Sequence, residues 1–122
     1  MNYFFRPAQR HDNLIAGGSS ESPVIDLGSL VPVALHIPGV FAPASITFRC
    51  GIDPDEAQIS EFYSLVDEDG SEYVIAPNPQ RHIALTPVRF AGAVKLIVRA
   101  GTHTAPLILG QDFDFTLMLR MP

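Results

Sequence analysis

The sequence predicts an all-β protein, an antiparallel β-sandwich of jelly-roll type with about eight short strands. Eleven prolines and nine glycines are spread along the 122 residues, which leaves no room for a long helix. Between them lie short runs in which apolar and polar residues alternate, the pattern of half-buried strands. A chain of this length forms one domain with a core that needs no disulfide or metal.

The N-terminal half contains three candidate strands, and residues 23–27 (PVIDL) are the weakest of them. Alternation over residues 31–37 predicts one apolar face, made of Val31, Val33, Leu35 and Ile37. The opposite face holds Pro32, Ala34 and His36. We therefore interpret His36 as a strand residue and not as a catalytic or metal-binding one. Residues 45–50 (SITFRC) place Ile46, Phe48 and Cys50 opposite Ser45, Thr47 and Arg49.

A hairpin and one helical turn are expected in the middle of the chain. The weaker strands of this region are residues 62–66 (FYSLV), 72–76 (EYVIA) and 82–85 (HIAL). Residues 67–70 (DEDG) supply a turn between the first two, because Asp and Gly accept positive φ at low cost. Residues 86–92 (TPVRFAG) predict a single helical turn, with Thr86 as N-cap and Pro87 at the first helical position.

The last two strands show the clearest alternation. In residues 93–100 (AVKLIVRA), one face holds Val94, Leu96 and Val98, and the other holds Lys95, Ile97 and Arg99. In residues 113–121 (FDFTLMLRM), the apolar face consists of Phe113, Phe115, Leu117, Leu119 and Met121. Both patterns are typical of strands that cover a core with one face.

Composition argues against nucleic acid and membrane as partners. The formal charge is −5, from thirteen acidic and eight basic residues, and Lys95 is the only lysine. A nucleic-acid-binding protein would concentrate Lys and Arg, because phosphate neutralisation supplies most of its affinity. No run approaches the ~18 apolar residues that cross a bilayer, and the start MNYFFRPAQR lacks a signal-peptide pattern. We expect synthesis in a reducing cytoplasm, and the single Cys50 cannot form an intramolecular disulfide.

No residue pattern predicts an enzyme, so we assign no catalytic, cofactor-binding or metal-binding residues. There is no G-x-S-x-G motif, and Cys50 lies within a predicted strand. The four histidines lack the close spacing that places two metal ligands on one element. The acidic residues of 53–56 and 67–70 fall in turns and do not match a calcium-binding EF-hand loop. A loose Ca²⁺ site between loops stays an alternative.

The sequence divides into an N-terminal arm, residues 1–22, and a β-sandwich domain, residues 23–122. The arm ends in a Gly/Ser stretch but carries apolar side chains that a free solvated tail seldom presents. We therefore predict that the arm contacts a partner; the candidate interface residues are Tyr3, Phe4, Phe5, Arg6, Leu14 and Ile15. The alternative is an arm that folds back over its own sandwich.

A set of motifs from residue 24 onward resembles a known group of proteins. In order they are VIDLGSL, VPVALHIPGVFAPASITFRC, FYSLVDEDGSEYVI, RHIALTPVRFAGAVKLIVRAGT and FDFTLMLR. Their order and spacing resemble small all-β structural proteins of tailed bacteriophages and phage-like gene-transfer particles, over roughly residues 24–120. The loops 52–60 and 76–81 depart from that pattern. The resemblance implies a virion component and supplies no catalytic residues.

Two classes of function follow from the resemblance and the composition. The first is a capsid decoration or cement protein that binds the major capsid protein or other virion subunits, as a trimer or another symmetric homo-oligomer. The second is a carbohydrate- or receptor-binding module of a head or tail fibre. Sugar sites usually stack a ring on an exposed Trp or Tyr; this chain has no Trp and carries Tyr3, Tyr63 and Tyr73. A tail or connector subunit is a third alternative.

Overall fold

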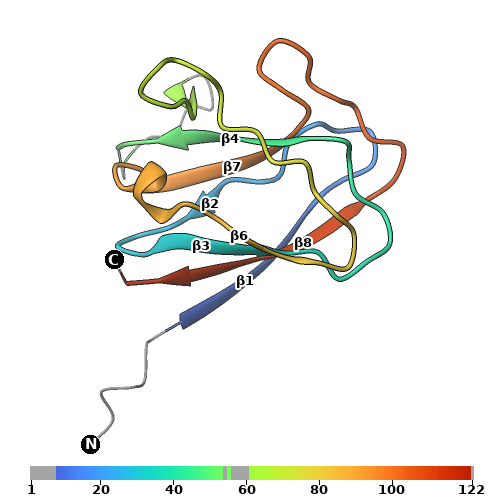
Figure 1. The fold of residues 1–122 in the computed structure, drawn as a ribbon, viewed down its shortest axis with the longest axis horizontal. Helices are drawn as coiled ribbons and strands as arrows, with labels where there is room; N and C mark the ends of the chain where they lie inside the picture. The colour runs from blue at the N-terminus through green and yellow to red at the C-terminus, as the bar shows by residue number, and fades with distance from the viewer. Residues whose placement is uncertain (1–7, 54, 56–60, 122) are drawn as a thin grey trace, which may run out of the picture.

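The computed structural model describes residues 8–53, 55 and 61–121 and contains two four-stranded antiparallel sheets (Figure 1). Sheet A has the strand order β1-β8-β3-β6, and sheet B has the order β2-β7-β4-β5. The strands are β1 (Ala8–Ile15), β2 (Ile25–Asp26), β3 (Val31–His36), β4 (Ile46–Gly51), β5 (Tyr63–Ser64), β6 (His82–Ala84), β7 (Lys95–Ala100) and β8 (Phe113–Arg120). The all-β prediction is confirmed, and the helix that the described residues show in full is the short 3₁₀ helix η2 (Pro87–Phe90).

Strand β8 lies in the interior of sheet A, between β1 and β3. Its predicted alternation is confirmed, since Phe113, Phe115, Leu117 and Leu119 are each at most 2% exposed. Met121 follows the strand end and is 56% exposed, so it does not extend the apolar face. Side chains from both sheets form one hydrophobic cluster with these four residues.

Strand β1 corrects our division of the chain. Residues 8–15, which we assigned to the arm, pair with β8 over their whole length, from Ala8 opposite Arg120 to Ile15 opposite Phe113. Ile15 is fully buried in the core. The sequence AQRHDNLI has few β-branched or aromatic residues, so its local propensity for a strand is weak. The strand is formed by pairing with β8, a tertiary effect that local patterning does not reveal.

Strand β3 differs from the prediction at its start because it contains an irregularity. Its register against β8 shifts between Pro32 and Ala34, and such a bulge moves the following side chains relative to the core. Pro32 and Ala34, which we placed on the outer face, are buried, and Val33 is partly exposed. Beyond the shift the prediction holds, since Leu35 and Ile37 are fully buried. His36 is partly exposed; its ring lies 5.7 Å from that of His82 on β6.

Sheet B is buried on more than one face. As predicted, Ile46 and Phe48 on β4 and Leu96 and Val98 on β7 are fully buried. Of the residues that we placed on the opposite face, three are buried as well: Thr47 is 0%, Ile97 1% and Arg99 5% exposed. Ser45, Arg49 and Lys95 are partly exposed. Strand β7 lies between β2 and β4, and a strand in the interior of a sheet can be covered on both sides.

The predicted hairpin turn and helical turn are both present. The N–H of Gly70 donates to the carbonyl of Asp67 at 2.9 Å, Gly70 has φ 85°, and Val66 forms an antiparallel bridge with Glu72. Residues 72–76 form isolated bridges and no continuous strand. Thr86 precedes η2, but its side chain makes no capping hydrogen bond. No helix of the described residues is long and apolar enough to cross a membrane.

An aromatic cluster fills the core beside η2. The ring of Phe48 lies 5.2 Å from that of Phe90 in an edge-on contact and 6.0 Å from that of Tyr73 in a stacked one. The guanidinium of Arg89 lies over the Tyr73 ring at 5.1 Å, and the N–H of Thr86 donates to the Tyr73 hydroxyl. Tyr73 is thus part of the packing between β4, η2 and the hairpin.

Candidate functional site

The predicted interface residues are separated by the structure. Tyr3, Phe4, Phe5 and Arg6 lie outside the described residues. Leu14 is partly exposed and lies opposite Asp114 of β8. Ile15 is fully buried in the core, so its side chain is not available to a partner of the folded protein. This part of the prediction treated a strand as a contact segment, for the reason given above for β1.

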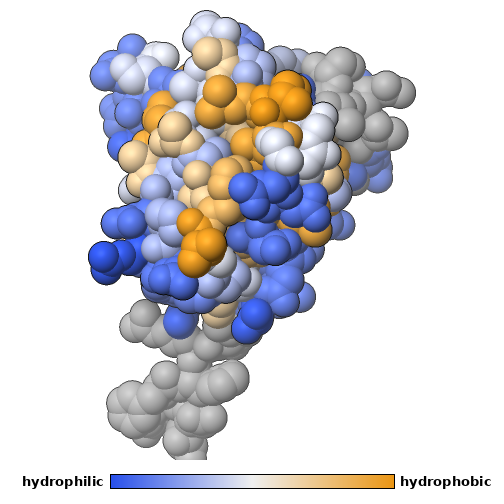
Figure 2. All heavy atoms as spheres, turned by 90° about the vertical axis from the view of Figure 1, so that its right-hand side faces the viewer, coloured by the Kyte–Doolittle hydropathy of each residue, from blue (hydrophilic) through white to orange (hydrophobic). Residues whose placement is uncertain are grey.

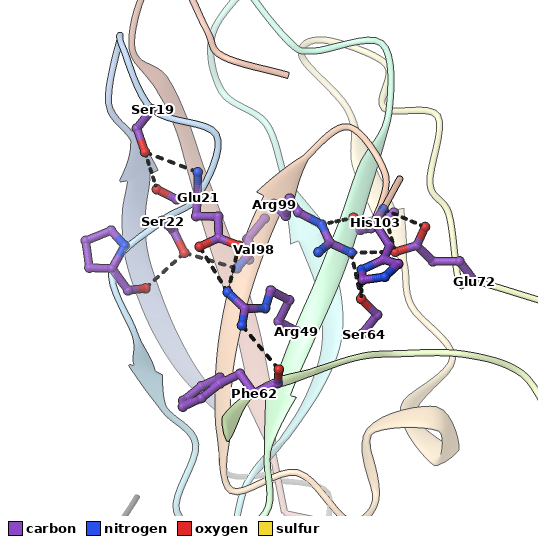
Figure 3. Close-up of polar contacts among 12 residues, drawn as sticks. Ser19, Glu21, Ser22, Arg49, Phe62, Ser64, Glu72, Val98, Arg99 and His103 are labelled. Atoms are coloured by element: carbon purple, nitrogen blue, oxygen red, sulfur yellow. Dashed lines mark hydrogen bonds and ion pairs between the residues drawn. The ribbon is translucent and has the colours of Figure 1, made fainter. Parts of the chain in front are cut away.

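A polar cluster on sheet B brings together side chains that the sequence analysis did not connect (Figure 3). Its centre is Arg99 on β7, which is 5% exposed. The Nε of Arg99 donates to the hydroxyl of Thr47 at 2.9 Å, and Nη2 donates to the hydroxyl of Ser64 at 3.0 Å. Nη2 also contacts the carboxylate of Glu72 at 2.5 Å. Nε and Nη2 of this guanidinium therefore each meet an oxygen, and the Glu72 carboxylate offsets the cost of burying its charge.

Ser64, His103 and Glu72 lie together in this cluster but do not have the geometry of a catalytic triad. The Ser64 hydroxyl is 3.2 Å from His103 Nδ1. The Glu72 carboxylate accepts from the main-chain N–H of His103, at 3.0 and 3.1 Å, and not from its ring. A triad carboxylate orients the imidazole through the second ring nitrogen. Here Glu72 holds Arg99 and the loop at residue 103, so its contacts are those of a structural clamp.

A second ion pair extends the cluster toward the start of the chain (Figure 3). Nη1 of Arg49 on β4 donates to both carboxylate oxygens of Glu21, at 2.9 and 3.2 Å. Nη2 of Arg49 donates to the main-chain carbonyl of Phe62 at 3.2 Å. Both charged side chains are less than one third exposed. The pair links β4 to the segment before β2 and to the segment before β5.

The two ion pairs border a hollow of about 490 Å³. It is lined by Glu21, Arg49, Phe62, Tyr63, Ser64, Val66, Arg99 and His103. Tyr63 is 66% exposed, whereas Tyr73 is taken up by core contacts. The sequence offered one signal for this site: Arg49 and Arg99 each stand inside a predicted strand, where an arginine is buried only if it is paired.

The loops at the end of the molecule opposite η2 carry exposed hydrophobic side chains, and Figure 2, which faces this end, shows separate hydrophobic areas among polar ones. Val40, on the loop between β3 and β4, is 79% exposed. Ile108 and Leu107, on the loop between β7 and β8, are 70% and 39% exposed. We call these three residues the apolar end. Large apolar side chains that are strongly exposed at one end of a protein are candidates for a contact surface.

An apolar groove lies at the other end, beside η2. Its volume is about 420 Å³, and its lining includes Leu30, Val31, Pro87, Val88, Ala93 and Val94. The lining is almost entirely apolar and contains no charged side chain. Such a groove can receive an apolar segment but offers no groups for acid–base chemistry.

The described residues show no reactive thiol and no group of His, Cys, Asp and Glu that could hold a metal ion. Burial raises the pKa of the Cys50 thiol to about 11, which keeps it protonated and unreactive at neutral pH. Asp53 and Asp55 are engaged in a local turn, where the Asp53 carboxylate accepts the N–H of Asp55 at 2.9 Å.

Comparison with known proteins adds no family assignment. No family model matches the chain, and no curated protein or solved structure matches it either.

Proposed function

We propose that this chain is a non-enzymatic structural protein of a phage or phage-like virion, a capsid decoration or cement protein with a jelly-roll sandwich fold. It is made in the host cytoplasm and binds the major capsid protein or a neighbouring virion subunit. The interleaved strand orders β1-β8-β3-β6 and β2-β7-β4-β5 support the fold, because a jelly roll consists of eight strands in two such sheets. The motifs from residue 24 onward support the virion assignment.

The apolar end is the observation that carries this proposal. Val40 and Ile108 are 79% and 70% exposed, although the sheets already bury a complete core. Covering these side chains against a shell removes apolar surface from water, which favours association. A protein that binds only the assembled shell stabilises it by mass action. The polar cluster on sheet B, in contrast, is occupied by internal contacts.

The test is cosedimentation of the purified protein with capsids assembled from the neighbouring major capsid gene. We expect binding in large copy number, and we expect Val40→Asp combined with Ile108→Asp to weaken it by about tenfold or more. Val88→Asp is the matched control, because Val88 is 76% exposed but lies on η2 at the opposite end. Equal binding by both variants would contradict the role of the apolar end. A few copies per particle would indicate a vertex or connector position.

The arm is tested by deletion of residues 1–7, which lie before β1. We expect this variant to fold and to lose capsid binding, because Tyr3, Phe4 and Phe5 would no longer anchor the protein. A longer deletion through residue 16 would also remove β1 and the buried Ile15, so its failure to bind would reflect lost folding. Binding of the short-deletion variant at wild-type affinity would exclude the arm as an anchor.

A second candidate function is carbohydrate binding at the hollow on sheet B. The observation that favours it is Tyr63, which is 66% exposed beside Arg49, Ser64 and His103. An aromatic face next to polar groups is the usual arrangement for holding a sugar ring. A glycan array on the wild type and on Tyr63→Ala distinguishes the functions. Glycan binding that is lost in the variant, without capsid binding, would replace the decoration proposal.

A further inference from the structure

Sheet A ends in a long strand whose outer edge is open. Strand β1 contains eight residues, whereas the other edge strands β2, β5 and β6 contain two, two and three. Among the described residues, β8 is the only strand that pairs with β1. The outer edge therefore presents backbone N–H and C=O groups to solvent. Long open edges are rare in soluble proteins, because they pair with further strands.

The side chains on the outer face of β1 carry opposite charges. Arg10 and Asp12 are 67% and 64% exposed and form an ion pair at 2.8 Å. The Thr116 hydroxyl also donates to the Asp12 carboxylate at 2.6 Å, and this bond and Arg10 both lower the pKa of Asp12. Asp12 therefore stays ionised at neutral pH. Arg10 directly precedes His11, and Asp12 directly follows it. In an antiparallel pair of two such strands centred on His11, each Arg10 therefore lies opposite an Asp12.

We propose that β1 pairs antiparallel with β1 of a second copy of this chain, so that two sheets A join into one continuous sheet. His11 of one copy lies opposite His11 of the other, at the two-fold axis. Arg10 then faces Asp12 of the second copy, and Asp12 faces its Arg10. Gln9 faces Asn13, and Ala8 faces Leu14. Side chains directly opposite each other in such a pair share a face of the sheet.

The charges select this register over its neighbours. If the second strand is displaced by two residues, Arg10 lies opposite Arg10 of the second copy for one direction of displacement. For the other direction, Asp12 lies opposite Asp12. Like charges directly opposite each other destabilise a strand pair, while opposite charges stabilise it. We compare only registers in which the Arg10 and Asp12 side chains of both copies lie on the same face of the joined sheet. Among these, only the pairing about His11 places each Arg10 opposite an Asp12.

The main-chain N–H of Leu14 is a hydrogen-bond donor at the open edge of β1. The N–H of Leu14 donates to the side-chain oxygen of its neighbour Asn13 at 2.8 Å, so this N–H is directed to the free edge. In the pair, the carbonyl of Ala8 of the second copy replaces Asn13 as the acceptor. The side chain of Asn13 thus accepts the Leu14 N–H in the free protein. On association it gives up this hydrogen bond, and the N–H donates to the second copy instead.

This association does not depend on the proposed virion function. It produces a dimer and no larger assembly. The same surface serves on both, so the contact is isologous and does not grow into a chain. The inference therefore replaces the trimer of the sequence analysis with a dimer.

The register is tested by cysteine cross-linking of the full chain under mild oxidation. In His11→Cys the two thiols face each other across the axis, where Cα atoms are about 4.5–5.5 Å apart, within the disulfide range. Gln9→Cys is the matched control: its two copies are about 13 Å apart at ~3.3 Å per residue, too far for a bridge. Cys50 can be kept, because burial raises its pKa to about 11.

We expect a covalent dimer from His11→Cys and none from Gln9→Cys. In sedimentation equilibrium we expect a wild-type dimer, a Kd raised about tenfold or more by Arg10→Asp, and recovery when Asp12→Arg is added, because the swap restores opposite pairs. The proposal would be overturned by a monomeric wild type at about 0.1 mM. It would equally be overturned if both cysteine variants, or neither, cross-linked, or if Arg10→Asp left the Kd unchanged.

Discussion

Replacing Phe48 with alanine is expected to lower the free energy of unfolding by about 3–5 kcal/mol, the range for large aromatic residues in a core. Phe48 is fully buried on β4. Its ring lies 5.2 Å from Phe90 and 6.0 Å from Tyr73. The truncation leaves a cavity between sheet B and η2, and both remaining rings lose a partner. η2 is a single short turn, so it has few other contacts with which to close the gap.

Equilibrium urea denaturation, followed by circular dichroism, measures this effect. The control is Phe41→Ala, since Phe41 is only partly buried and its ring contact with Phe113 is longer, at 6.5 Å. We expect the control to cost roughly half as much or less. A loss below about 1 kcal/mol for Phe48→Ala, with an unchanged denaturant slope, would show that the aromatic cluster is not a centre of stability.

Replacing Glu72 with alanine is expected to destabilise the fold by about 3–5 kcal/mol, because it leaves a buried guanidinium without its carboxylate. The side chains of Arg99 and Glu72 are 6% and 17% exposed. Thr47 and Ser64 would still accept hydrogen bonds from Arg99, but neither carries a charge. The N–H of His103 would also lose its acceptor.

The charge itself is tested by a second substitution. Combining Glu72→Leu with Arg99→Met removes both charges, and we expect it to recover most of the lost stability, since an apolar pair of similar size can replace a buried ion pair. Arg10→Ala is the control for an exposed ion pair and should change stability by about 1 kcal/mol or less. If Glu72→Ala costs no more than this control in urea denaturation, the Arg99–Glu72 pair does not hold the cluster together.

The strands that the sequence predicted well are those whose local pattern agrees with their place in the fold. In β8, alternate residues from Phe113 to Leu119 face the core, so period-two alternation found it. The turn at 67–70 was predictable because Gly70 adopts a positive φ, at 85°, that favours glycine. In both cases the information lies within a few neighbouring residues.

The rest of the fold depends on contacts between distant residues. β1 has a weak strand pattern and exists because β8 pairs with it. Arg99 looked like a surface residue of β7, but Glu72 on the hairpin and Thr47 on β4 allow it to be buried. The shift at Pro32 in β3 depends on the register against β8. An arginine inside a predicted strand hints that it is paired, but the partners in these contacts cannot be read from the local sequence.

The candidate surfaces were the least predictable part. Val40 and Ile108 stand in separate loops, and their sequence neighbours do not distinguish them from core residues. Only the fold places their loops at the end opposite η2 (Figure 1) and leaves both side chains exposed. The hollow beside Tyr63 likewise combines residues from positions 21 to 103. The predicted contact residues Tyr3, Phe4, Phe5 and Arg6 lie outside the described residues, so their role stays a prediction.

The position of β8 between β1 and β3 also determines when the protein can fold. On the ribosome, β1 and β3 emerge early, but they do not pair with each other. Sheet A is incomplete until residues 113–120 have left the exit tunnel and entered between them. Until then the apolar faces of both strands stay open to solvent and to other nascent chains. We infer that sheet A forms only after β8 has emerged, so the yield of native protein depends on how quickly this strand inserts.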